Sequence, residues 1–267
     1  MMRSDDLVML YSGPDQVDYA YLSPETAGVY QNKHGSFQHR SLVGKAFGTR
    51  IRASNSDGWV DALAPTPELW ASAVRHRTQI VHQLDAAVVC FELGVRRSSV
   101  CAEAGTGSGA MTGALSRSCG SVHTYEFNEA RATAAQGEFE RNGLTNVTVR
   151  HCDVCEEGFR DLDVDSVDAV FLDLPEPWRA LPHALRVAKP GARIATYSPC
   201  VEQVHRTRDA LSTCLDLRTL EVRQRDFVVK DVLLETGLAP PAKRRKDYQN
   251  EDDAPRRYAN CAFLAWF

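Results

Sequence analysis

Residues 98–215 alternate between short apolar runs and longer runs of mixed polarity, and this alternation constrains the fold more than any other feature. The short runs end at turn residues, which is typical of buried strands. The longer runs, such as residues 128–143, have apolar side chains at helical spacing. Strict alternation of strand and helix predicts an α/β fold with a doubly wound, mostly parallel sheet covered on both faces.

Residues 1–64 have a different texture, with short apolar runs broken by Gly, Pro, Asn and Asp. This pattern predicts small strands and tight turns, and so a small N-terminal β domain. A boundary follows at Ala64-Pro-Thr-Pro67. Residues 65–94 have helical spacing and stop at Gly94, so we expect one long helix that links the β domain to an α/β domain over 65–267.

The C-terminal region contains two apolar stretches, at 220–235 and 260–267, which predict further strands. Between them, residues 236–257 are polar and rich in proline and charge, which predicts a mobile surface loop. The basic run Lys243–Lys246 within this loop resembles a nuclear import signal. We therefore expect the protein to reside in the nucleus.

Charge and cysteine content limit the classes of function. The net charge of −4 gives no overall attraction to nucleic acid, so RNA binding requires local basic patches or the surface of a partner. No apolar run is long enough for a membrane helix, and the acidic N-terminus is not a secretory signal, so we expect an intracellular protein with no membrane contact. The sequence HCDVC at 151–155 has no second pair at metal-ligand spacing, so we expect no metal.

The sequence EAGTGSG follows the first predicted strand and combines Glu103 with Gly105, Gly107 and Gly109. Glycine turns at a helix start cradle phosphate through bare backbone N–H groups. A carboxylate in such a cradle repels phosphate. Glu103 therefore favours a ligand that is cationic or rich in hydroxyl donors at this point.

Carboxylates also stand at the ends of the next three predicted strands, at Glu126, Asp153 and Asp173. Ligands of doubly wound sheets bind beyond these ends. Glu126 lies 21 residues after Gly105, about where an acid binds a ribose diol, and Asp153 could accept from an adenine amine. S-adenosylmethionine (SAM) offers these groups and a cationic amino-acid end for Glu103. Each acid taken singly could equally be a helix cap or a surface charge.

Longer motifs resemble one family: PTPELW at 65–70, HRTQI at 76–80, EAGTGSG, DLPEPW at 173–178 and SPCVEQV at 198–204. Over about residues 55–215 the chain resembles the catalytic subunit of the tRNA N1-methyladenine methyltransferase that acts at T-loop position 58. The resemblance implies a Rossmann-like methyltransferase sheet, SAM as cofactor and tRNA as partner. It also implies a tetramer of two catalytic and two noncatalytic homologous subunits in eukaryotes, against a homotetramer in bacteria.

The resemblance implies a set of cofactor contacts as well. They fall on Val81, Ser108, Gly109, Ala110, Glu126, Arg131, Asp153, Val154 and Asp173. Glu103, Gly105 and Gly107 from the glycine motif complete the predicted cofactor site.

Asp173 is the predicted catalytic residue. The N1 atom of a paired adenine is buried in a hydrogen bond, so the base must be extruded before it can react. We expect the Asp173 carboxylate to accept from the exocyclic amine, to orient N1, and to stabilise the positive charge that develops on the ring. Action as a general base is the second role that we expect for Asp173.

Six residues are expected to contact RNA. Gln79 and His82 are predicted to lie one turn apart on the linking helix, close to Val81, although a buried histidine or a solvated glutamine is the alternative. Trp178 can stack on a base or pack against the helix that follows it. The remaining predicted contacts are Pro175, Ser198 and Gln203.

Other functions stay open at this point. The same fold could methylate another acceptor, or the chain could be a noncatalytic RNA-binding subunit of the same complex. An NAD-dependent oxidoreductase would need pyrophosphate at the glycine turn, which Glu103 opposes.

Overall fold

The computed structural model describes residues 1–13, 16–23, 28–74, 78–211 and 217–223. The predicted loop at 236–257, its basic run, and the predicted strand at 260–267 lie outside the described residues. Most of the predicted strand at 220–235 also lies outside them, and its described part, 220–223, has no regular structure.

The N-terminal part forms a four-stranded antiparallel sheet with the order β2-β1-β6-β5. Its elements are β1 (Leu7–Gly13), β2 (Gln16–Tyr21), β5 (Thr49–Arg52) and β6 (Trp59–Leu63), with a separate hairpin of β3 (Val29–Asn32) and β4 (Gly35–Gln38) and a short helix η1 (His39–Ser41). Side chains alternate along β1, so Val8 and Leu10 face this domain's own core. Leu7 and Met9 face the other way and pack on Trp70. Both faces of β1 are therefore buried.

Two helices replace the single linking helix that the sequence predicts, and that prediction is wrong. Helix α1 (Pro67–Ala73) begins at Thr66, whose hydroxyl caps Leu69 N, and α2 (Gln83–Leu93) ends at Gly94 in the left-handed conformation. Between them, residues 78–82 are not helical. Ile80 and Val81 are consecutive, yet they are buried in two different apolar clusters. Neighbouring side chains can point in opposite directions on a non-helical backbone, so burial of Ile80 and Val81 in two clusters agrees with the absence of a helix here.

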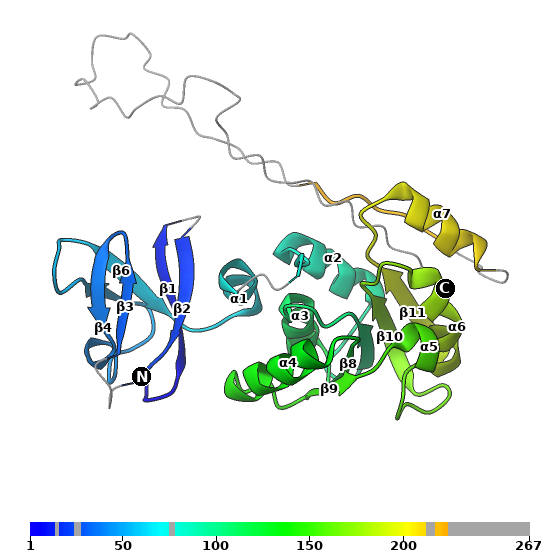
Figure 1. Ribbon diagram of the computed structural model, residues 1–267, viewed down its shortest axis with the longest axis horizontal. Coiled ribbons are helices and arrows are strands. Elements are labelled where there is room, and N and C mark those ends of the chain that lie inside the picture. Colours follow the sequence, from blue (N-terminus) through cyan, green and yellow to red (C-terminus); the bar gives the residue numbers. More distant parts are fainter. Residues whose placement is uncertain (14–15, 24–27, 75–77, 212–216, 224–267) are drawn as a thin grey trace, which may run out of the picture.

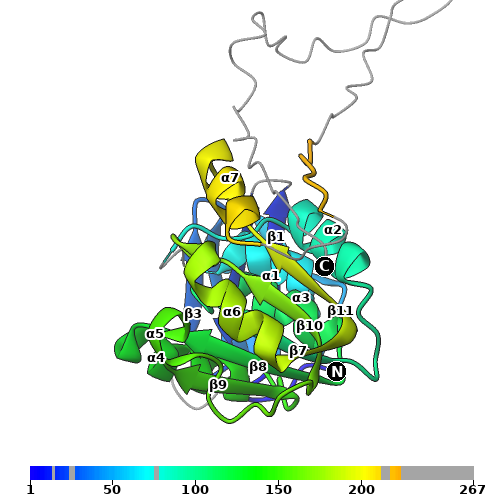
Figure 2. The same cartoon turned by 90° about the vertical axis from the view of Figure 1, so that its right-hand side faces the viewer.

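The rest of the described chain forms a five-stranded sheet with the order β11-β10-β7-β8-β9, and every neighbouring pair is parallel. The strands lie side by side in one twisted sheet (Figure 2). They are β7 (Val100–Ala104), β8 (Ser121–Glu126), β9 (Val147–His151), β10 (Val167–Leu172) and β11 (Ala188–Thr196). The helices are α3 (Ala110–Ser118), α4 (Glu129–Arg141), α5 (Val154–Glu157), α6 (Pro177–Val187) and α7 (Val201–Asp209). The predicted doubly wound α/β fold is confirmed.

Helices α2 and α3 cover one face of this sheet, and α5 and α6 cover the other (Figure 1). Cys101, Phe171 and Ala195 point toward α2 and α3, whereas their neighbours Ala102 and Val170 point toward α6. Burial on both faces explains why these strands are continuous apolar runs. The same alternation places Glu103, Asp173 and Tyr197 on the α2–α3 side.

The β domain is docked on the larger domain through aromatic side chains. The rings of Tyr19 and Trp70 have centroids 4.9 Å apart. The Tyr21 hydroxyl donates to Asn142 Oδ1 at 2.7 Å, and the Arg141 guanidinium stands 3.6 Å from the centre of the Tyr21 ring. The β domain thus contacts both α1 and the end of α4. Within the described residues, no helix has the length and apolarity needed to cross a membrane.

Candidate active site

The strand order reverses at β7, whose two neighbours are β10 and β8, so the site is expected at the carboxyl ends of these strands. The loop after β7 makes two close approaches that require glycine. A Cβ atom on Gly105 would lie 2.2 Å from the carbonyl oxygen of Asp173, and one on Gly107 would lie 2.6 Å from Thr78 Oγ1. Both glycines have positive φ angles, of 98° and 53°. The glycines therefore bring the loop against two other segments of the chain.

Glu103 is fully buried between β7, β8 and α3. Its Oε2 accepts from Thr112 Oγ1 at 2.6 Å, while Oε1 has no hydrogen-bond partner among the described residues. Burial raises the pKa of Glu103 to about 7, and the hydroxyls of Thr112 and Thr124 partly oppose that rise. A buried acceptor without a donor is costly. A cationic or N–H group that reached Oε1 would relieve that cost, so this residue fits the amino-acid end of SAM.

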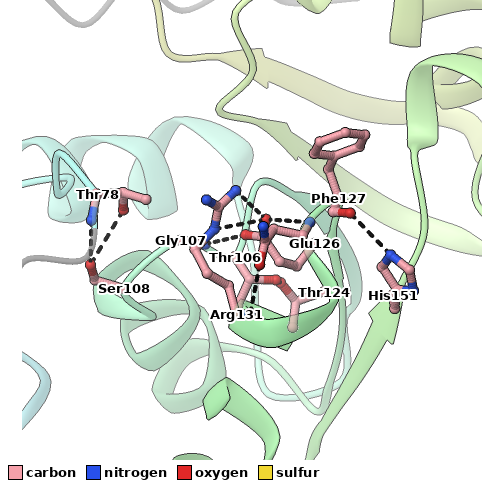
Figure 3. Close-up of polar contacts among 10 residues, drawn as sticks. Thr78, Thr106, Gly107, Ser108, Thr124, Glu126, Phe127, Arg131 and His151 are labelled. Atoms are coloured by element: carbon pink, nitrogen blue, oxygen red, sulfur yellow. Dashed lines mark hydrogen bonds and ion pairs between the residues drawn. The ribbon is translucent and has the colours of Figure 1, made fainter. Parts of the chain in front are cut away.

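Glu126 ends β8 with its side chain almost completely buried and fully engaged (Figure 3). Its carboxylate accepts from Gly107 N at 3.0 Å and from Asn128 N at 2.9 Å. Arg131 donates twice to Oε1, at 3.0 Å from Nε and 2.6 Å from Nη2. A carboxylate offers about four lone-pair sites. A ribose diol at this position must therefore share the carboxylate with Arg131 or displace it.

Asp153 follows β9 and is the N-cap of the short helix α5, where its Oδ1 accepts from Cys155 N at 2.9 Å. The capping role that the sequence left open is thus present. No bond to Oδ2 is found among the described residues, so this oxygen is available to a donor such as an adenine amine. The next residue, Val154, is buried in the core beneath α6.

Asp173 directly follows β10, and its backbone N donates to Ala104 O at 2.9 Å. Its carboxylate has neither a hydrogen bond nor an ion pair within the part of the chain that the structure describes. Desolvation by the surrounding protein raises the pKa of Asp173 to about 7, although the residue keeps some contact with solvent. The group can therefore accept a hydrogen bond or hold a proton near neutral pH, and it stands free to meet a ligand.

Gln79 and His82 do not lie on a helix face as predicted, because both belong to residues 78–82 between α1 and α2, which are not helical. His82 is the residue that precedes α2 and has extended backbone angles. Both side chains are exposed. The structure therefore removes the helical argument for this pair, but leaves both groups accessible.

The four other predicted RNA contacts lie near the loop after β10. Gln203 Nε2 on α7 donates to Pro175 O at 2.9 Å, which ties α7 to this loop. Trp178 packs against the core below α6, and the Arg206 guanidinium stands 5.2 Å from its ring. Ser198 is fully buried, and its hydroxyl has no partner among the described residues, so it presents no surface to RNA.

Val81 and Ala110, two predicted cofactor contacts, are buried. They help to line a pocket of about 290 Å³ between α1, α2 and α3. Its lining includes neither Glu126 nor Asp173, so this pocket is distinct from the strand ends.

Sequence reasoning missed Thr78 and Thr112. The Thr78 backbone N donates to Ser108 Oγ at 3.2 Å, and its hydroxyl lies 3.3 Å from the same oxygen (Figure 3). Thr78 stands inside the HRTQI motif, which was a usable signal. Thr112 is a single threonine within a helix, and nothing in its local sequence marks it as the partner of Glu103.

Phe127 is a third residue that sequence reasoning missed. Its side chain is 67% exposed beside Glu126, and its carbonyl oxygen is 3.0 Å from His151 Nε2 (Figure 3).

Cys152 of the HCDVC sequence packs in the core, and its thiol donates to Gly158 O at 3.4 Å. Among the described residues no cluster of His, Cys, Asp or Glu is arranged to hold a metal ion.

A parallel sheet whose switch point joins a glycine loop to buried carboxylates suits a cationic nucleoside and opposes a pyrophosphate. The fold and the site define the chain as a Rossmann-like, SAM-dependent methyltransferase. The fold is similar to that of a SAM-dependent O-methyltransferase from Thermotoga maritima, with a TM-score of 0.75, 26% identity and coverage of 99% of this chain and 93% of that one. A tRNA (m1A58) methyltransferase TrmI from Aquifex aeolicus has the same fold, with a TM-score of 0.74, 22% identity and coverage of 99% and 97%.

The family follows from sequence. Residues 58–261 match the model of the tRNA methyltransferase complex GCD14 subunit, and the chain belongs to this family. It is 38% identical over 235 residues to the tRNA (adenine(58)-N(1))-methyltransferase catalytic subunit trmt61a of Dictyostelium discoideum, covering 85% of this chain and 75% of that protein. It is 41% identical over 248 residues to the catalytic subunit TRM61 of Cryptococcus neoformans, covering 90% and 54%. The chain thus spans about half the length of the Cryptococcus relative.

Proposed function

We propose that this protein transfers a methyl group from SAM to N1 of adenine at position 58 in the T-loop of tRNA. We further propose that it acts as the catalytic subunit of a complex with a noncatalytic homologous subunit, two copies of each, and that it resides in the nucleus. Family membership and the names of the relatives support the substrate. The family is that of a subunit of the tRNA methyltransferase complex, which supports a partner.

The free carboxylate of Asp173 is the observation that carries this proposal. Asp173 stands at the switch point, has no partner among the described residues, and has a pKa raised to about 7. When bound, SAM supplies an electrophilic methyl group on a sulfonium. Asp173 accepts a hydrogen bond from the exocyclic amine of the target adenine, which points N1 toward that methyl group. The same charge stabilises the positive ring as the bond forms, because a poorly solvated carboxylate acts strongly on a nearby cation.

The cofactor side is assigned to residues at the carboxyl ends of β7, β8 and β9. Glu103 Oε1, buried without a donor, faces the amino-acid end. Glu126 holds the ribose hydroxyls and keeps its bond to Gly107 N, so cofactor binding and the shape of the glycine loop are coupled. Asp153 Oδ2 accepts from the adenine amine.

The RNA side is assigned to the loop after β10 and to the segment between α1 and α2. The contact between Gln203 and Pro175 holds α7 against that loop. Gln79 and His82 are exposed and available to RNA. The target base must leave its stack to reach Asp173, so recognition depends on the shape of the T-loop.

The test is a transfer assay with the purified protein, alone and with its homologous partner, using labelled SAM and T-loop transcripts with adenine or guanine at position 58. We expect label only on the adenine transcript, mapped to N1 by mass spectrometry. Label on the guanine transcript, or on N6, overturns the acceptor. Binding of tRNA without any binding of SAM would instead indicate a noncatalytic RNA-binding subunit.

A further inference from the structure

The segment 78–82, between α1 and α2, is attached at both ends to parts of the active site. At its start, Thr78 is hydrogen-bonded through its backbone N and its hydroxyl to Ser108 of the glycine loop. Just beyond its end, in the first turn of α2, Asp85 Oδ2 accepts from the Tyr197 hydroxyl at 3.2 Å. We name residues 78–82 the connector. It carries the exposed Gln79 and His82 between these two attachments.

Tyr197 is also bonded through its backbone to the end of β10, next to Asp173. Its backbone N donates to Leu172 O at 2.8 Å, and Leu172 precedes Asp173. Thr196 pairs with Leu172 across β11 and β10, so Tyr197 stands opposite Asp173 in register. Strand alternation places both side chains on the α2–α3 side. The Tyr197 hydroxyl thus binds Asp85 in the first turn of α2, and the Tyr197 backbone binds Leu172, the residue before Asp173.

Asp85 is a costly residue for this position if packing alone is its role. It is only 5% exposed, and burial raises its pKa, while the Tyr197 hydroxyl and the charge of His82 partly oppose that rise. Replacement of a buried polar pair by apolar side chains is often neutral or stabilising. Val81, Ala86 and Val89, which are close to Asp85 along the chain, are all buried in one apolar cluster, so apolar residues are accommodated in this part of the chain. The carboxylate is thus better explained by what it holds than by the stability it contributes.

We propose that Asp85 is a positioning residue that acts through Tyr197. It fixes the connector relative to the end of β10, so that Gln79 and His82 stand at a set distance from Asp173. This inference rests on the proposed function, because it assigns the connector to the RNA side of the same site. We assign Asp85 no direct contact with SAM or the reacting atoms, because its carboxylate is buried and accepts from Tyr197.

The experiment uses the full chain with its partner and compares Asp85→Ala, Asp85→Asn and Tyr197→Phe. Asp168→Ala is the matched control, because Asp168 accepts from Val100 N at 2.8 Å and from Lys189 Nζ at 2.7 Å at the opposite ends of the strands. The readouts are KM for tRNA, kcat, and hydrogen exchange of the connector amides in the RNA-free protein.

We expect Asp85→Ala and Tyr197→Phe to raise KM for tRNA about tenfold, to change kcat less than about threefold, and to speed exchange in the connector. Asp85→Asn keeps an oxygen that accepts from Tyr197, so it should restore most of the KM. Asp168→Ala should lower the melting temperature and leave KM unchanged. If Asp85→Ala does not fold, Tyr197→Phe, which removes only a hydroxyl, decides the matter.

Unchanged connector exchange in a folded Asp85→Ala or Tyr197→Phe variant overturns the inference, as does an equal rise of KM in Asp168→Ala. The exchange comparison needs no RNA. It therefore still decides the positioning role if the wild-type protein methylates a different acceptor, which would contradict the proposed function alone.

Discussion

The carboxylates on the two sides of β7 differ in their hydrogen bonding. On the β8 side, Glu126 is held by two backbone N–H groups and by Arg131, so its geometry is set before any ligand arrives. On the β10 side, Asp173 has no partner among the described residues, and its pKa is raised to about 7. A group with satisfied hydrogen bonds is suited to binding, and an unpaired group with a perturbed pKa is suited to chemistry. Under the proposed function, the β8 side of the switch point is the cofactor side and the β10 side is the acceptor side.

Replacement of Asp173 by Ala should give the largest effect. We expect transfer to fall on the order of 10³-fold, because the orienting acceptor and the stabilising charge are both lost. SAM affinity should stay within roughly tenfold of wild type. Single-turnover assays and calorimetry measure the two quantities. An equal loss of both would make Asp173 a cofactor ligand and remove the division between the sides.

Replacement of Glu126 by Ala should weaken SAM binding on the order of 100-fold, since it removes the ribose acceptor and frees Gly107 N. Arg131→Ala is the paired variant. If Arg131 mainly occupies the lone pairs that the ribose needs, its loss should change affinity less than about threefold. A loss as large as that of Glu126→Ala would show that Arg131 itself contacts the cofactor. Calorimetry with SAM distinguishes these outcomes.

The pH dependence of the transfer rate should follow the ionisation of Asp173 on the acceptor side. Asp173 must be ionised to stabilise the ring cation, and its pKa is raised to about 7. The rate under kcat/KM conditions should therefore fall toward a limiting slope of about tenfold per pH unit below pH 7. The affinity of the protein for the product S-adenosylhomocysteine, measured over the same pH range, is the control for changes in cofactor binding. A rate that is flat from pH 5.5 to 8 contradicts a rate-determining Asp173 carboxylate whose pKa is near 7.

Glu103 lies on β7, between the two sides, and should affect how the free energy of unfolding depends on pH. Burial raises its pKa from 4.5 to about 7, so its folded form holds the proton more tightly than its unfolded form. The stability that protonated Glu103 contributes to the fold is therefore fully present below about pH 4.5. It is lost as the pH rises through about 7, because the buried group must then ionise. Glu103→Gln should raise stability on the order of 1 kcal/mol at pH 8 relative to wild type, and change it little at pH 4.5. Thermal unfolding at both pH values measures this, and an equal effect at both would mean that Glu103 is not strained by its charge.

Gln203→Ala should give the smallest effect. It removes the bond to Pro175 O on an exposed surface, so α7 is held less firmly against the acceptor loop. We expect KM for tRNA to rise about threefold and SAM affinity to stay unchanged. Gln136→Ala on α4, which loses an exposed bond to Glu140, is the control. Equal KM values for the two variants would exclude α7 from the acceptor side.

Much of the architecture follows from spacing along the chain. The parallel sheet and the carboxylates at its strand ends were predictable, because buried strands and covering helices leave different periods in the sequence. The prediction of one linking helix was wrong because it also relied on this periodicity alone. Ile80 and Val81 fit a helical pattern, but the structure buries them in two separate clusters and the chain is not helical there. A pattern states that a side chain is apolar, but not which cluster buries it.

The sequence by itself determined the class of fold, the positions of Glu103, Glu126, Asp153 and Asp173 near strand ends, and membership of a family of tRNA methyltransferases. Only the tertiary structure decided how each carboxylate behaves. Glu126 became a fully bonded anchor, Glu103 a half-satisfied buried acid, Asp153 a helix cap, and Asp173 an unpaired group with a raised pKa. The physical reason is that a carboxylate is tuned by donors and by burial, and these come largely from segments that are distant in the sequence.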